Sequence, residues 1–112
     1  MPVKINTNSG KTIAYLSGEI DHHNAWPLRE AIDNELRRLR PGTLRMDFGG
    51  VSFMDSSGVG LVMGRYKTLS AYGGRLELMN VPAQIYKVMK LSGIEKIAKI
   101  YRKDVNKGED NQ

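Results

Sequence analysis

The sequence has 112 residues, enough for one domain and too few for two of ordinary size. Hydrophobic residues make up 40% and charged residues 26%, a balance typical of a soluble globular domain. No apolar run approaches the ~20 residues of a membrane-spanning helix, and the first residues lack the apolar stretch of a secretory signal. Cysteine is absent, which excludes disulfides and thiolate metal sites and agrees with a reducing, cytoplasmic setting.

The net charge of +5 falls entirely in the second half of the chain, where residues 56–112 carry ten basic and five acidic side chains. No aromatic residues are interleaved with these cations in the way that single-strand binders use them. We therefore expect a solvated basic surface, with neither nucleic acid nor a membrane as a direct partner.

The first half predicts a hairpin followed by a helix. Alternating apolar residues flank the turn-forming segment Asn6–Gly10, which predicts two antiparallel strands. Apolar residues then recur at steps of three and four, at Ala25, Leu28, Ile32, Leu36 and Leu39. We expect Asp21 or Asn24 to cap this helix, Trp26 to pack at its entry, and Pro41-Gly42 to end it.

The second half predicts alternating strands and helices. Strands are expected at 43–48, 75–79 and 96–101, one helix after Asp55, and another that opens with Asn80-Val81-Pro82. The resulting order is β-β-α-β-α-β-α-β, an α/β fold with a mixed sheet, because strands joined through helices run parallel. Residues 1–102 form one domain, and 103–112 are predicted to be a polar, disordered tail.

Some fragments resemble catalytic motifs without their usual context. Gly58, Gly60 and Gly64 have almost the spacing of a dinucleotide fingerprint, but the last interval is one residue too long. The other interpretation is that Gly60 and Gly64 let a helix approach the sheet closely. His22 and His23 are the only histidines, and adjacent residues point apart, so no metal site and no metal or other cofactor is expected.

The segment Val51–Gly58 between the third strand and the second helix carries the most information. Asp55 is expected to cap the helix by accepting a backbone N–H from Ser57 or Gly58. This accounts for Asp55 but leaves a second hydroxyl, Ser57, in the first helical turn. The functional interpretation is that Ser57 accepts a phosphoryl group, which would meet free N–H groups and the positive end of the helix dipole.

This segment resembles the anti-sigma factor antagonists of endospore-forming bacteria, which are STAS domains. The residues that carry the resemblance are Ser52–Gly60, Gly64–Lys67, Gly18–Ala25, Gly73–Leu76 and Leu91–Ile94. The resemblance implies a mixed sheet with helices mainly on one face and a cytoplasmic, non-enzymatic switch in sporulation transcription. The unphosphorylated form would bind an anti-sigma factor that is also a serine kinase, holding ATP or ADP, and so release a sigma factor.

The resemblance also implies residue roles. Phosphorylation would fall on the second serine of the turn, Ser57, and a PP2C-type phosphatase would reverse it. The partner-binding surface would comprise Asp21, Met54, Asp55, Ser56, Ser57 and Gly58. The protein would have no catalytic residues, and a monomer is favoured.

Three alternatives stay open. A STAS module could serve another signalling assembly or a transporter. Residues 58–64 could bind a nucleotide or another small ligand. A hydrolase could use Ser57 with His22 or His23 as base and Asp21 as orienting group. The methionines at 46, 54, 63, 79 and 89 are expected to fill the core, the alternative being a soft docking patch.

Overall fold

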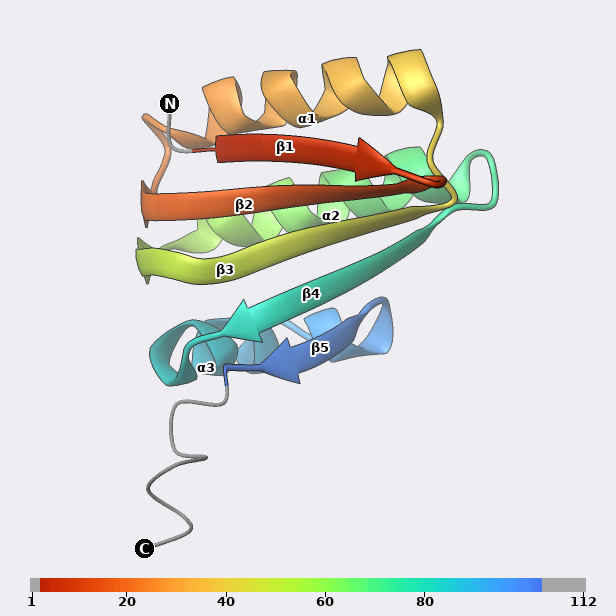
Figure 1. Ribbon diagram of the computed structural model, residues 1–112. Helices are drawn as coiled ribbons and strands as arrows, with labels where there is room; N and C mark the ends of the chain where they lie inside the picture. The colour runs from red at the N-terminus through yellow and green to blue at the C-terminus, as the bar shows by residue number, and fades with distance from the viewer. Residues whose placement is uncertain (1–2, 104–112) are drawn as a thin grey trace, which may run out of the picture.

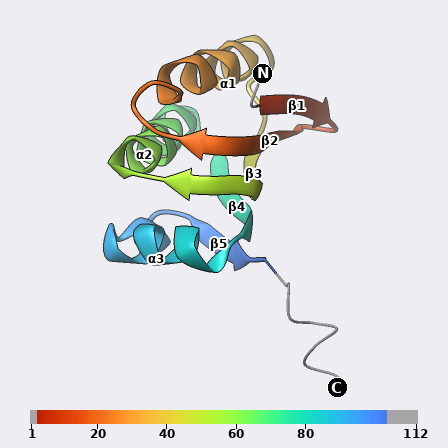
Figure 2. The ribbon, with the colours of Figure 1, turned by 90° about the vertical axis from the view of Figure 1, so that its left-hand side faces the viewer.

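The computed structural model describes residues 3–103, which form one five-stranded sheet with three α-helices on one face (Figures 1 and 2). The elements in chain order are β1 Val3–Asn8, β2 Lys11–Ile20, α1 Ala25–Leu39, β3 Thr43–Met54, α2 Ser56–Ser70, β4 Arg75–Val81, α3 Ala83–Leu91, a 3₁₀ turn Ile94–Lys96 and β5 Lys99–Arg102. The predicted fold class and element order are confirmed. The tail predicted at 103–112 lies outside the described residues from 104 onward.

Strand order in the sheet is β1-β2-β3-β4-β5, so chain neighbours are also spatial neighbours. Strand β1 pairs with β2 antiparallel, and β2, β3, β4 and β5 pair in parallel. The hairpin turn is Ser9-Gly10, shorter than the predicted segment Asn6–Gly10, because residues 6–8 belong to β1 and pair with β2. Both turn residues have positive φ (53° and 77°), which matches the right-handed twist of the two strands. The mixed sheet predicted from the connections is therefore confirmed.

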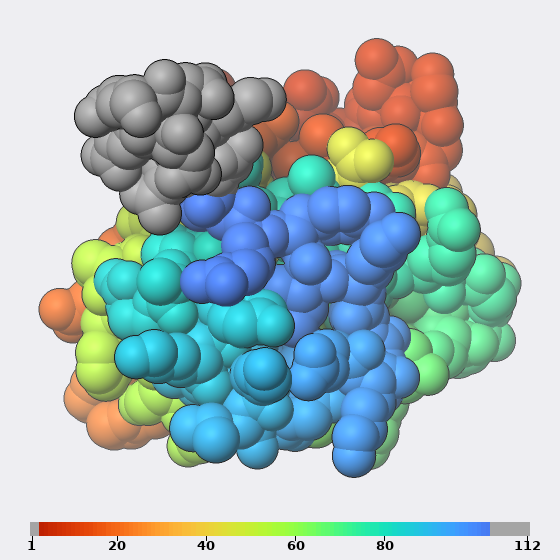
Figure 3. All heavy atoms as spheres, turned by 90° about the horizontal axis from the view of Figure 1, so that it is seen from below, coloured from red at the N-terminus to blue at the C-terminus, as the bar shows by residue number. Residues whose placement is uncertain are grey.

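Other predicted boundaries were also wrong. Strand β3 continues to Met54 instead of ending at Phe48, because its second half pairs in parallel with Ser17–Ile20 of β2. Helix α3 begins at Ala83 with Pro82 before it, and Val81 still belongs to β4. The strand predicted from Lys96 begins only at Lys99, because Ile94–Lys96 is a 3₁₀ turn. Figure 3 shows this last part of the described chain in blue, at the surface seen from below.

The core lies between the sheet and the helices. Helix α1 contributes Leu28, Ile32 and Leu36, spaced so that one face meets the sheet, and each is at most 1% exposed. Burying such a side chain contributes about 1.5–3 kcal/mol. Three of the five methionines, Met46, Met54 and Met89, are core residues, whereas Met63 is 37% exposed. No helix within residues 3–103 is long and apolar enough to cross a membrane.

A buried ion pair connects the two helices that flank the candidate site. Nε of Arg65 in α2 lies 2.9 Å from Oδ1 of Asp33 in α1, and the two side chains are 5% and 10% exposed. Burial lowers the pKa of Arg65, and Asp33 opposes this by favouring the charged guanidinium. Arg29 lies 3.6 Å from the second carboxylate oxygen at the surface.

We expect Asp33→Ala to lower the free energy of unfolding by about 3–5 kcal/mol, because it leaves the Arg65 charge buried without its partner. Asp33→Leu combined with Arg65→Met removes both charges and should recover most of this loss. Urea unfolding measures both variants, with Arg38→Ala as control, since its bridge to Glu35 is exposed. If the double variant were as unstable as the single one, the lower free energy of unfolding would be due to lost packing and not to the unpaired charge.

Candidate functional site

The candidate site is the turn from β3 into α2. Asp55 caps the helix from extended backbone (φ −105°, ψ −165°), and its Oδ1 accepts the N–H of Ser57 at 2.8 Å. The Asp55 carbonyl accepts the N–H of Gly58 at 3.0 Å. The predicted cap is confirmed, and its carboxylate stands at the positive end of the helix, where an anion is favoured.

Asp21 lies in the turn from β2 into α1, and its Oδ1 accepts the N–H groups of His23 at 3.0 Å and Asn24 at 3.1 Å. Both residues precede the helix, so Asp21 stabilises the turn and does not cap α1. Asn24, the other predicted cap, holds the N-cap position without a side-chain cap hydrogen bond, and its side chain donates to the Glu19 carbonyl at 2.9 Å.

The two turns are held side by side by the sheet. Ile20 and Met54, the last residues of β2 and β3, are paired in register, and the Asp55 N–H donates to the Ile20 carbonyl at 3.2 Å. Figure 1 shows β2 and β3 ending at the same edge of the sheet, so Asp21 and Asp55, which directly follow these strands, share that edge. Both residues are partly exposed, and their carboxylates make this edge acidic.

The predicted partner-binding residues divide into two groups. Asp21, Asp55, Ser56 and Ser57 have accessible surface in the turns, Ser56 exposed and Ser57 half-buried. Met54 and Gly58 are buried. A Cβ built on Gly58 would collide with Cγ and Sδ of Met54, so these two residues support the turn from beneath instead of presenting side chains to a partner.

A groove continues from this turn between α1 and α2. Ser57 lines it together with Trp26 and Arg29 of α1 and with Gly60 and Gly64 of α2, and it encloses about 570 Å³. A Cβ at Gly60 or Gly64 would have no atom within 4 Å. The expectation that these glycines bring the helix close to the sheet is therefore wrong, because both face open space.

Trp26 lies at the surface, contrary to the prediction. Trp26 was expected to pack at the helix entry, but it is 63% exposed at the rim of the groove. Arg29 and Lys67, which also line the groove, were not singled out as site residues. A signal was present in the sequence, since two glycines four apart inside a helix cost about 1 kcal/mol each relative to alanine and needed a reason.

The nucleotide-binding alternative fits the geometry poorly. The first-turn N–H groups that would hold a phosphate are partly occupied, because Asp55 accepts from Ser57. Gly58, the first fingerprint glycine, is covered by Met54 and so offers no bare backbone.

One observation supports the hydrolase alternative: His22 and Ser57 line the same groove. The rings of His22 and His23 pack on one another with centroids 4.0 Å apart, so the expectation that these neighbours point apart is wrong. The Asp21 oxygen that would orient a histidine base accepts backbone N–H groups instead. Over the described residues no three His, Asp or Glu side chains gather as a metal site would require.

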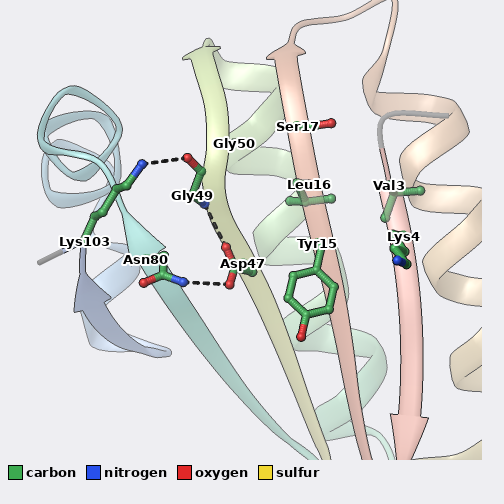
Figure 4. A pocket seen from close by; sticks show the side chains of 10 residues that line it. All are labelled: Val3, Lys4, Tyr15, Leu16, Ser17, Asp47, Gly49, Gly50, Asn80 and Lys103. Carbon is green, nitrogen blue, oxygen red and sulfur yellow. Dashed lines mark hydrogen bonds between the residues drawn. The ribbon is translucent and has the colours of Figure 1, made fainter. Parts of the chain in front are cut away.

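A second hollow lies on the helix-free face of the sheet, across β1, β2, the middle of β3 and the end of β4 (Figure 4). Two of its charged side chains, Asp47 and Lys103, bond to other groups of the chain. Asp47 accepts the Gly49 N–H at 2.9 Å and the Asn80 side-chain amide at 2.8 Å. Lys103 donates to the Gly49 carbonyl at 3.0 Å. These contacts rigidify the strand ends and leave the turn and its groove as the stronger candidate site.

The sheet order, the one-sided helices and the capped Asp-Ser-Ser-Gly turn define a STAS domain. Residues 2–105 match the STAS domain family, and the chain belongs to it. The chain is 32% identical over 106 residues to the anti-sigma F factor antagonist of Paenibacillus polymyxa, covering 95% of this chain and 91% of that protein.

Solved structures agree with this assignment. The anti-sigma factor antagonist SpoIIAA in its unphosphorylated form superposes with a TM-score of 0.78 at 30% identity over 96% of both chains. The phosphorylated form of the Bacillus cell fate determinant SpoIIAA superposes with a TM-score of 0.71 at 31% identity over 97% of both chains.

We expect Gly58→Ala to lower the free energy of unfolding by about 1–3 kcal/mol, because the new methyl group must displace Met54 in a filled core. Gly60→Ala, two residues further on, is the matched control and should stabilise the protein by up to about 1 kcal/mol through helix propensity alone. Thermal and urea unfolding measure both. Equal effects of the two substitutions would contradict the different surroundings assigned to these glycines.

Proposed function

We propose that this protein is an anti-sigma factor antagonist that acts in the cytoplasm. In its unphosphorylated form it binds an anti-sigma factor and so frees a sigma factor. The observation that carries the proposal is the Asp55-capped turn with Ser56 and Ser57, beside the turn that Asp21 stabilises, in a STAS domain related to proteins of that name.

The partner in this proposal is an anti-sigma factor that is also a serine kinase with ATP or ADP bound, and a PP2C-type phosphatase restores the unphosphorylated form. The protein itself is a substrate and a binder with no enzymatic activity. The support from the structure is local: Ser57 has a backbone N–H bonded to Asp55 but no hydrogen bond to a histidine over the described residues.

One serine of the turn accepts the phosphoryl group in this proposal. The sequence predicts Ser57, and Ser57 borders the groove at half burial. Ser56 is the more exposed of the two, and a kinase must surround the hydroxyl that it phosphorylates. Accessibility therefore favours Ser56, and the two residues have to be tested as a pair.

Phosphorylation would act on docking more than on folding. A phosphoserine adds about −1.5 to −2 charges at neutral pH. It would stand beside the carboxylates of Asp21 and Asp55, on an edge where solvent absorbs most of the repulsion. A partner shaped for a neutral hydroxyl would have to bury this charge without a counterion, which is costly.

A second candidate function is that of a STAS module in another signalling assembly. It involves the same fold, turn and groove but a different partner. Binding without phosphorylation would distinguish that module from the antagonist.

We expect the anti-sigma factor kinase of the same genome, with ATP, to add one phosphate within the turn, as located by mass spectrometry. Ser56→Ala should abolish phosphorylation if the more exposed serine is the acceptor. Ser57→Ala should abolish phosphorylation if the serine predicted from the sequence is the acceptor. A mixture lacking the kinase is the control. Binding without any phosphate would favour the module outside this cycle, and the absence of both would refute the proposed function.

We expect phosphorylation to leave the fold unchanged, because the new charge lies at an accessible helix end that already holds a carboxylate. Backbone amide chemical shifts should then change mainly in residues 52–62. Spectra of the phosphorylated and unphosphorylated protein compare the two states directly. Shift changes spread across the sheet would mean that the switch works by refolding.

A further inference from the structure

The turn that carries the proposed function is small compared with a specific interface. A stable protein–protein contact buries roughly 800 Å² on each partner, from about 20–30 residues. The turns at Asp21 and Asp55 offer only a few exposed side chains. A partner that docks on them must also cover neighbouring surface, and the α1–α2 groove is continuous with the turn because Ser57 lines it.

The floor of this groove is bare helix backbone. Gly60 and Gly64 lie one turn apart inside α2, and neither has a neighbour that a methyl group would touch. Glycine inside a helix destabilises it relative to alanine, and no contact within the described chain requires these two. Their positions permit another chain to approach the helix more closely than any larger residue would allow.

The walls of the groove are cationic. Arg29, Arg65 and Lys67 line it, with no carboxylate among the lining residues. Asp33 lies beneath, with Oδ1 2.9 Å from Nε of Arg65 and Oδ2 3.6 Å from Nε of Arg29. Arg65 is 4% exposed, and its Nε and Nη1 and the Asp33 Oδ1 are buried without a hydrogen bond in the described chain. Arg29 and Lys67 are exposed and are therefore the cations that the groove presents to solvent.

An exposed aromatic residue completes the rim. Trp26 is 63% exposed and lies in the first turn of α1, beside the groove. Tryptophan and arginine are the residues most enriched at the centres of protein–protein interfaces.

We propose that the α1–α2 groove receives an acidic segment of the anti-sigma factor, with small side chains against Gly60 and Gly64 and carboxylates toward Arg29 and Lys67. This inference rests on the proposed function and names the second half of its interface. The acidic turns at Asp21 and Asp55 then face a cationic part of the same partner. The opposite charges of the two halves fix the direction in which the partner lies.

Binding of the anti-sigma factor kinase of the same genome, measured by calorimetry, tests the groove with two independent variants. Gly64→Leu fills the floor and should weaken binding at least about tenfold while leaving the fold intact. Lys67→Glu reverses a wall charge and should also weaken binding, with a reduced dependence on salt. Lys90→Glu is the matched control, since Lys90 is likewise exposed in the last turn of its helix, α3.

Because the chain has no cysteine, a single introduced thiol can be labelled selectively to identify the segment that occupies the groove. Gly64→Cys introduces a single thiol in the groove, and a thiol-anchored photo-cross-linker there should attach to a partner peptide rich in Asp and Glu. A neutral or basic peptide, or a cross-linked pair of this chain formed without the partner, would overturn the proposal.

The outcomes distinguish a failure of the groove proposal from a failure of the proposed function. Unchanged affinity of Gly64→Leu and Lys67→Glu, together with lost affinity of Asp55→Arg, would overturn the groove and leave the proposed function standing. If the unsubstituted protein did not bind the anti-sigma factor, the proposed function would be refuted. The proposal that an acidic segment of that partner occupies the groove would then be refuted as well.

Discussion

The candidate site depends on one constraint, the parallel pairing of β2 with β3. Parallel strands end at the same edge of a sheet, so the turns that follow them are neighbours however far apart they are in the chain. Pairing of Ile20 with Met54 and the bond from the Asp55 N–H to Ile20 bring Asp21 and Asp55 together. A slip of one residue would turn Met54 outward and remove the support beneath Gly58, so the buried face of β3 fixes the site as well as the sheet.

The second constraint is the spacing of α1 and α2. A buried ion pair such as Arg65–Asp33 contributes little net stability, because desolvation offsets most of the attraction. It does specify which side chains face one another. With two glycines on α2 opposite the entry of α1, that spacing leaves a groove where larger residues would have filled the gap. The groove is thus a consequence of small side chains combined with a fixed helix position.

The sequence was most informative where local chemistry decides structure. The helix cap at Asp55, the Ser9-Gly10 turn and the apolar spacing of α1 depend on nearby residues, and each was predicted. The long β3 was missed because Gly49-Gly50 has the composition of a turn, and only pairing with β2 keeps it extended. The groove was missed because exposure of Trp26 and the open faces of Gly60 and Gly64 depend on how two distant helices pack.

The charges around the turn explain how one phosphate can control a whole interface. The groove is basic and the turns beside it are acidic, so the partner must present both signs in a fixed order. A phosphoserine placed at their junction has the same sign as the acidic segment proposed for the groove. Two unit charges 4 Å apart repel by about 4 kcal/mol at an effective dielectric of 20. Because about 1.4 kcal/mol corresponds to a tenfold change in affinity, even a screened fraction of this repulsion suffices to release the partner.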